Sequence, residues 1–179
     1  MAYEVGGRAD KSGNRFEYNW TINKVLEVLK EKIVYITIEA VGDDERGVDL
    51  WIGNKDGSCE GQQCKGRVRS NEYWTYGAVK EKGVWDKWKF QLESSKTHSV
   101  SLVSPLTFTL LEDLAQRART TDIKKIRDFY DYQINKSGAD TVKLFHQYCG
   151  VMGLDPSKEN ELETAIDYLS RTYYRKFDD

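Results

Sequence analysis

Three polar residues near the middle of the chain have types and a spacing that suit phosphodiester hydrolysis. Asp49 lies in an alternating segment, and Gln63 and Lys65 follow two residues apart in the next one. A carboxylate and an amide oxygen are hard ligands that suit Mg²⁺, which usually keeps several waters and completes its shell with substrate phosphate. The Lys65 ammonium could orient or help deprotonate the attacking water and stabilise charge at phosphorus.

The segments that carry these residues are predicted to form a β-hairpin. The tight-turn sequence Asn54–Gly57 joins a strand over residues 47–53 to a strand over residues 58–67. Successive side chains of a strand point to opposite faces, so Asp49 faces away from the apolar side of the first strand. That apolar side is predicted to consist of Val48, Leu50 and Ile52. If it is buried, Asp49, Gln63 and Lys65 converge on the other face.

The order of predicted elements is that of an α/β protein. β-branched runs predict strands, and apolar residues at helical spacing predict helices. The predicted elements are a helix over 14–32, strands over 33–40, 47–53 and 58–67, a helical region over 71–91, a strand over 99–104, and helices over 107–118, 122–135, 139–152 and 158–176. We therefore expect an α/β core over residues 1–105 and a helical extension over residues 106–179.

The net charge of the chain does not indicate a polyanionic partner. The 179 residues include 27 Lys and Arg against 29 Asp and Glu, for a formal charge of −2, so any nucleic-acid site must be a local patch. Basic residues outnumber acidic ones between Gly61 and Phe90, and alternation places Arg67 and Arg69 on the face of Lys65. The residues that we expect to bind DNA are Arg67, Arg69, Lys80 and Lys82.

Aromatic and cysteine residues favour structural roles. Trp74, Trp85 and Trp88 are predicted to be core residues rather than stacking platforms for bases. The three cysteines show no CxxC spacing, and Met1 is not followed by a secretory signal, so we expect a reducing, cytoplasmic compartment. No apolar run approaches the length of a membrane span, so no membrane partner is expected.

Asp49 in Gly-Val-Asp-Leu-Trp-Ile, followed after a turn by Gln63-Cys64-Lys65, resembles the D…QxK variant of the PD-(D/E)xK nuclease signature. The chain is most similar to Mrr-type restriction endonucleases and to the N-terminal effector nucleases of antiphage STAND NTPases of the Avs type. The resemblance covers roughly residues 6–104. It implies a restriction endonuclease-like core, whose order of helix, three-stranded meander, helix and strand is the order predicted above.

The resemblance also implies a third ligand and an activity. Gly13-Asn14-Arg15-Phe16-Glu17-Tyr18 is similar to the first helix of the family, where an acidic residue often completes the metal site, so Glu17 joins Asp49 and Gln63 as a metal ligand. The implied enzyme is a Mg²⁺-dependent endodeoxyribonuclease, for which Mn²⁺ is an alternative metal. Its substrate is double-stranded DNA, and its role is antiphage defence. We expect further domains of a longer protein to follow the chain and to hold it in a homo-oligomer.

One residue departs from the commoner form of the signature. The third-strand carboxylate of ExK is Gln63 here, a neutral and weaker ligand. Glu60 could be proposed as its replacement, but alternation puts Glu60 on the opposite face unless a bulge intervenes.

Three other interpretations stay open. The first is that the chain binds metal poorly because of Gln63 and is a catalytically silent DNA-binding or oligomerisation module. The second is that it is a stand-alone Mrr-like restriction endonuclease. The third is that an Asp, a Gln and a Lys on a sheet face form an ordinary solvated surface, with Glu17 an ordinary acid on a helix face. A cleavage assay with and without metal separates the nuclease from the silent module.

Overall fold

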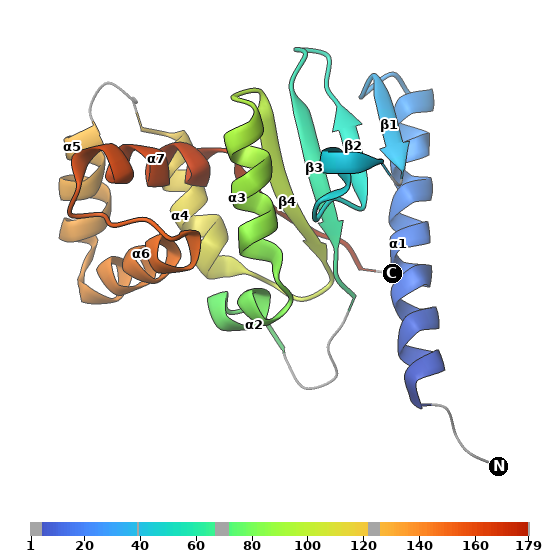
Figure 1. The fold of residues 1–179 in the computed structure, drawn as a ribbon, viewed down its shortest axis with the longest axis horizontal. Helices are drawn as coiled ribbons and strands as arrows, with labels where there is room; N and C mark the ends of the chain where they lie inside the picture. The colour runs from blue at the N-terminus through green and yellow to red at the C-terminus, as the bar shows by residue number, and fades with distance from the viewer. Residues whose placement is uncertain (1–4, 39, 67–71, 122–125, 179) are drawn as a thin grey trace.

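The protein has an α/β fold built on one five-stranded mixed sheet (Figure 1). The computed structural model describes residues 5–38, 40–66, 72–121 and 126–178. Seven α-helices lie in these ranges. The elements are α1 (Val5–Leu29), β1 (Tyr35–Ile38), β2 (Leu50–Gly53), β3 (Cys59–Cys64), α2 (Tyr76–Glu81), α3 (Val84–Ser94), β4 (His98–Ser104), α4 (Thr109–Arg119), α5 (Ile126–Asp128), α6 (Ala139–Met152), α7 (Glu159–Ser170) and β5 (Thr172–Lys176).

The strands lie in their sequence order, β1-β2-β3-β4-β5. β1, β2 and β3 form an antiparallel meander, whereas β3 and β4, and β4 and β5, are parallel. A parallel neighbour needs a crossover connection, and α2 and α3 supply it between β3 and β4. The predicted order of helix, three-stranded meander, helix and strand is confirmed.

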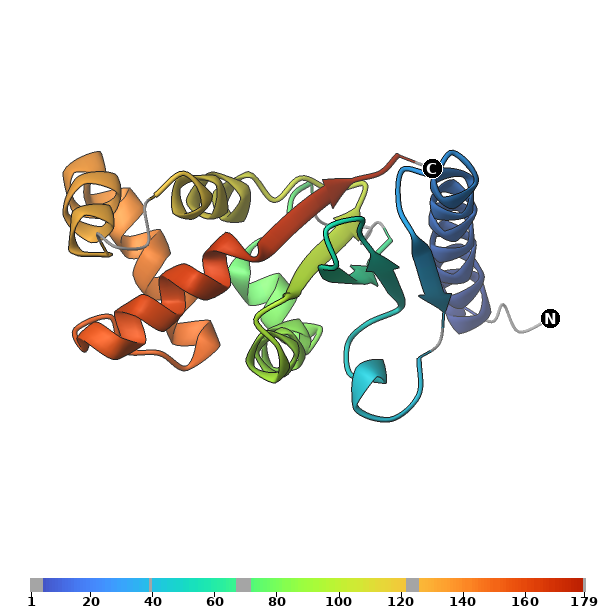
Figure 2. The same ribbon diagram turned by 90° about the horizontal axis from the view of Figure 1, so that it is seen from above.

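The two faces of the sheet have separate apolar clusters. Phe16 and Trp20 of α1 pack with strand residues that include Val103, whereas Trp88 of α3 belongs to the larger cluster with Leu102. Leu102 and Val103 are neighbours in β4, and neighbouring strand residues point to opposite faces. α1 and α3 therefore cover opposite faces of the sheet, and Figure 2 shows them on different sides of the strands. No helix among the described residues is long and apolar enough to cross a membrane.

The predicted tryptophan core is confirmed. Trp74, Trp85 and Trp88 are buried in the larger cluster, and the indole of Trp74 donates a 2.8 Å hydrogen bond to Ser104 Oγ. Helices α4 to α7 gather at the end of the molecule away from α1 (Figure 1) and share this cluster. The region after residue 105 therefore packs on the sheet through one continuous apolar core.

The chain after α7 differs from the prediction. A single helix over 158–176 is wrong, because the helix ends at Ser170 and Thr172–Lys176 forms β5 beside β4. Backbone hydrogen bonds to β4 and the β-branched and aromatic residues Thr172, Tyr173 and Tyr174 favour a strand here. The predicted helix over 122–135 begins outside the described residues and continues as α5 and a π-helical turn, Phe129–Ile134.

The hairpin that carries the candidate site forms as predicted. Asn54 and Ser58 close the turn with a 2.9 Å backbone hydrogen bond, and Gly57 adopts a positive φ of 83°. The carboxylate of Asp56 accepts hydrogen bonds from Ser58 N and Oγ. The register pairs Leu50 with Gln62.

Candidate active site

A cavity of about 480 Å³ brings together the three residues that were predicted to bind metal. Glu17, Asp49 and Gln63 line it, together with residues 40–41 and 47–48 and Lys87 of α3. It lies at the end of the β2–β3 hairpin, where α1 approaches from one face of the sheet and α3 from the other. The predicted convergence of Asp49 and Gln63 is thus found in the structure.

The backbone of Asp49 lies in a bend just before β2. Its N–H donates a 2.9 Å hydrogen bond to Gln62 O, and its Oδ2 accepts a 2.7 Å hydrogen bond from Cys64 N. The predicted position of Val48 is wrong. A Cβ on Gly61 would lie 2.8 Å from Val48 Cγ2, so Val48 covers Gly61 and does not join Leu50 and Ile52 in their cluster. The bend interrupts the strand alternation one residue before the ladder begins.

Gln63 is a buried residue with an unpaired oxygen. Its side chain is 3% exposed, and Oε1 has no hydrogen-bond partner among the described residues. A buried carbonyl oxygen without a partner costs about 1–3 kcal/mol. A cation coordinated by Gln63 Oε1 would supply the missing partner and offset this cost.

Glu60 lies on the opposite face of β3, as the alternation predicts. Arg175 of β5 donates two hydrogen bonds to its carboxylate, of 3.0 and 2.6 Å, and Gln62 Nε2 donates a third of 2.8 Å. Burial alone would raise the pKa of Glu60, but the hydrogen bonds and positive charge of Arg175 outweigh it, so the pKa lies below its usual value. Glu60 is engaged in a buried ion pair and does not replace Gln63 as a ligand.

The same polar chain holds α1 against the sheet. Trp20 Nε1 donates a 2.7 Å hydrogen bond to Gln62 Oε1, and Gln62 in turn donates to Glu60. Because Glu17 lies one helical turn before Trp20, this contact fixes the part of α1 that brings Glu17 to the cavity.

The carboxylates of Glu17 and Asp49 both affect the pKa of the Cys64 thiol. Burial and then the negative charges of Asp49 and Glu17 raise the pKa of the Cys64 thiol, whereas the positive charge of Lys65 opposes them. Cys64 is 8% exposed and packs in the α1 cluster, so it is a core residue.

Lys65 lies beside the carboxylate of Asp49, as predicted. Its Nζ is 4.0 Å from Asp49 Oδ2, and both side chains are about one quarter exposed. The backbone N–H of Lys65 donates to Val103 O, which extends the ladder beyond the last residue of β3. Asp49, Gln63 and Lys65 therefore come together at one end of the hairpin, with Lys65 at its rim.

Lys87 is a charged residue of the cavity that was not among the predicted site residues. It lies on α3, more than twenty positions after Gln63, and no local pattern joins it to the hairpin. The pairing of α3 with the loop before Asp49 depends on contacts between distant segments. A signal was nevertheless present, because Lys87 belongs to the basic stretch between Gly61 and Phe90.

Of the residues predicted to bind DNA, the two that the structure describes, Lys80 and Lys82, do not line this cavity. Arg67 and Arg69 lie outside the described residues. Lys80 is exposed in the last turn of α2, and Lys82 is exposed at its C-terminal cap. Figure 1 shows α2 beside one end of α3, on the same side of the sheet.

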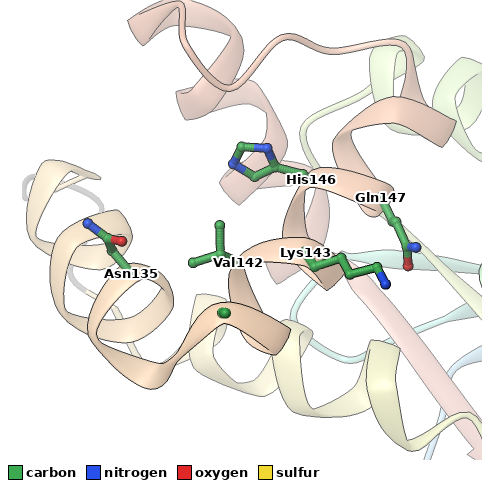
Figure 3. Close-up of a pocket in the computed structure, with 6 residues that line it drawn as sticks. Asn135, Val142, Lys143, His146 and Gln147 are labelled. Carbon is green, nitrogen blue, oxygen red and sulfur yellow. The ribbon is translucent and has the colours of Figure 1, made fainter.

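A larger cavity, of about 740 Å³, lies elsewhere, in the helical region. Asn135 faces α6 across it, with Val142, Lys143 and His146 on the α6 side (Figure 3). His146 Nε2 lies 3.2 Å from the hydroxyl of Tyr130. None of the described residues that line this cavity carries a carboxylate, so the cavity at the hairpin is the better candidate for metal-dependent chemistry.

The donor set at the hairpin fits a hard divalent cation. Two carboxylates and an amide oxygen are the ligand types that Mg²⁺ takes, and the unpaired Gln63 Oε1 is the observation on which this fit rests. Within the described part of the chain, no three His, Cys, Asp or Glu residues form a metal-binding group, and here the third ligand is an amide. Comparison of the chain with protein-family models, curated proteins and solved structures finds no match.

Proposed function

We propose that the protein is a Mg²⁺-dependent endodeoxyribonuclease of the PD-(D/E)xK class, with the restriction endonuclease-like core that its sequence resembles. One observation carries the proposal: Glu17, Asp49 and Gln63, whose Oε1 is buried and has no partner among the described residues, line one cavity, with Lys65 at 4.0 Å from Asp49. These residues come from α1, the approach to β2, and β3. Their meeting supports a shared site rather than scattered polar residues on a solvated face.

Each residue has a role in this proposal. Glu17, Asp49 and Gln63 would hold the metal, which when bound polarises the phosphodiester and lowers the pKa of water. Lys65 orients the attacking water and stabilises negative charge at phosphorus. The hydrogen bond from Cys64 N holds Asp49 Oδ2 in place, so that at least one ligand is pre-organised.

Double-stranded DNA is the proposed substrate, and antiphage defence in the cytoplasm is the proposed role. One such site cuts one strand, so a double-strand break needs two copies. Tethering two copies raises their effective concentration to the order of millimolar. We therefore propose that the active form is a homo-oligomer and that activity rises when copies are joined.

Plasmid cleavage tests the proposal. Supercoiled DNA is incubated with the protein, alone and fused to a heterologous dimer, in Mg²⁺, Mn²⁺ or EDTA. We expect nicking and linearisation with either metal, more from the fusion, and none in EDTA. Asp49→Asn should lose at least about 100-fold in rate, because a ligand loses its charge.

Asp43→Asn is the matched control, because Asp43 lies in the same loop with its side chain 79% exposed. Equal loss in both variants, or cleavage that persists in EDTA, would contradict the proposal. DNA binding without cleavage under every metal condition would favour the silent module instead.

A further inference from the structure

A lysine borders the carboxylate cavity from the opposite face of the sheet. Lys87 of α3 lines the same cavity as Glu17 of α1, and α1 and α3 cover opposite faces. Lys65 stands at the end of β3 beside Asp49. The cavity is thus lined by one lysine and two carboxylates, and a second lysine, Lys65, lies next to one of these carboxylates.

The stem of Lys87 is held against the loop that leads to Asp49. A Cβ on Gly47 would overlap with Lys87 Cβ and lie 2.7 Å from Lys87 Cδ, so the aliphatic stem lies directly on the glycine. One turn later, Gln91 Nε2 donates hydrogen bonds to Asp43 O and Arg46 O of the same loop. α3 therefore holds this loop at two adjacent positions, and the position of Lys87 relative to Asp49 is constrained.

The charge of Lys87 is not neutralised by the acids of the site. In this region the described side chains form the ion pairs Lys65–Asp49 and Arg46–Asp43, and neither includes Lys87. The Lys87 ammonium is therefore free to pair with an anionic ligand in the cavity.

We propose that Lys87 binds the phosphate at which cleavage takes place. The proposal rests on the proposed nuclease function. In hydrolysis, the oxygen of water forms a bond to phosphorus, the bridging P–O bond breaks, and the leaving oxygen takes a proton. The phosphoryl group passes from one negative charge to two as hydroxide adds. Glu17 and Asp49 balance a divalent cation, so the charges of Lys65 and Lys87 together match the phosphoryl group in the transition state.

Lys87→Met and Lys87→Arg test the proposal, with Lys89→Met as the matched control. Lys89 lies on the same helix, does not line the cavity, and approaches Gly153 of the helical region. We expect Lys87→Met to lower kcat about 100-fold, the cost of one lost transition-state contact. Lys87→Arg should recover most of this loss, and Lys89→Met should match the wild type.

Two further measurements separate phosphate binding from a structural role. Calorimetric titration with Mg²⁺ should give Lys87→Met an affinity no lower than that of the wild type, because Lys87 is no ligand. DNA affinity in EDTA, measured over a range of salt, should show a log–log slope about 0.9 smaller for Lys87→Met, since one phosphate contact is lost. A wild-type kcat and slope for Lys87→Met would overturn the proposal, and so would a parallel loss of Mg²⁺ affinity.

The proposed nuclease function can fail independently of the proposal that Lys87 binds phosphate. If the wild type is as inactive as Asp49→Asn, the proposed function is wrong. The salt slope in EDTA then still decides whether Lys87 contacts phosphate: a smaller slope supports the contact, and an unchanged slope overturns it.

Discussion

The backbone N–H of Cys64 donates a 2.7 Å hydrogen bond to Asp49 Oδ2, so a candidate metal ligand also closes the end of the β2–β3 ladder. Asp49 therefore has a structural role in addition to the proposed chemical one. Substitutions at this residue must separate the two roles.

Asp49→Asn and Asp49→Ala should differ in stability but not in activity. The asparagine oxygen can still accept from Cys64 N, whereas alanine leaves that donor unpaired and should cost about 1–2 kcal/mol in the free energy of unfolding. Urea denaturation measures the difference, and plasmid cleavage should be lost in both. Equal stability of the two variants would mean that water replaces the carboxylate at no cost.

Gln63 provides the sharpest test of the metal site. Gln63→Glu adds a charged ligand and should raise Mg²⁺ affinity by about tenfold. In EDTA the same variant should melt at a lower temperature than the wild type, because a buried negative charge is added near the partly exposed carboxylates of Glu17 and Asp49.

Gln63→Met is the matched change that removes the ligand oxygen instead of adding a charged one. It removes the unpaired oxygen at similar volume, so the free energy of unfolding in EDTA should rise by about 1 kcal/mol. The rise in melting temperature with Mg²⁺ should disappear. Melting scans with and without Mg²⁺ measure both variants, and a wild-type response from Gln63→Met would exclude Gln63 as a ligand.

The buried pair Glu60–Arg175 ties β5 to β3 across β4. Arg175→Met leaves Glu60 buried without its positively charged partner and should cost about 2–4 kcal/mol at pH 7, somewhat less than for a fully buried pair because Arg175 is 40% exposed.

The pH dependence of this cost follows from the lowered pKa of Glu60. A carboxyl whose folded pKa lies below its ordinary 4.5 contributes stability that is present above that pH and is lost as the pH falls through the folded value. The difference between the wild type and Arg175→Met should therefore shrink in acid. Urea denaturation at pH 7 and near pH 3 checks this, and a constant difference would show that the pair contributes through packing alone.

Gly47→Ala should disturb the site more than a matched glycine does. Gly47 and Gly57 both have positive φ, 68° and 83°, which costs alanine about 1–2 kcal/mol. An alanine at Gly57 meets open space, whereas one at Gly47 would contact the Lys87 stem. We expect Gly57→Ala to lose only the backbone cost, and Gly47→Ala to lose about 1 kcal/mol more and to lower cleavage. Urea denaturation and plasmid cleavage measure the free energy of unfolding and the activity of the two variants, and equal losses in both variants would contradict the prediction.

Much of the fold and the core of the site could be predicted from local sequence. Alternation within a strand and the Asn54–Gly57 turn are properties of neighbouring residues, so the hairpin, the shared position of Asp49 and Gln63, and the opposite position of Glu60 follow without knowledge of the rest. The helix over Ala139–Met152 was predicted with its observed bounds for the same reason.

Tertiary structure decided the features that depend on distant partners. Thr172–Lys176 becomes a strand because β4 offers hydrogen bonds that a local helical pattern cannot reveal. Val48 leaves the predicted face because the bend at Asp49 lets it cover Gly61.

The formation of the cavity also depends on contacts between distant segments. Trp20 binds Gln62 and Gln91 binds the loop before Asp49, and these long-range hydrogen bonds bring α1 and α3 to the hairpin. The local sequence determined which side chains share a strand face. The packing of distant helices determined that Glu17 and Lys87 join them, because a cavity forms only where separate elements meet.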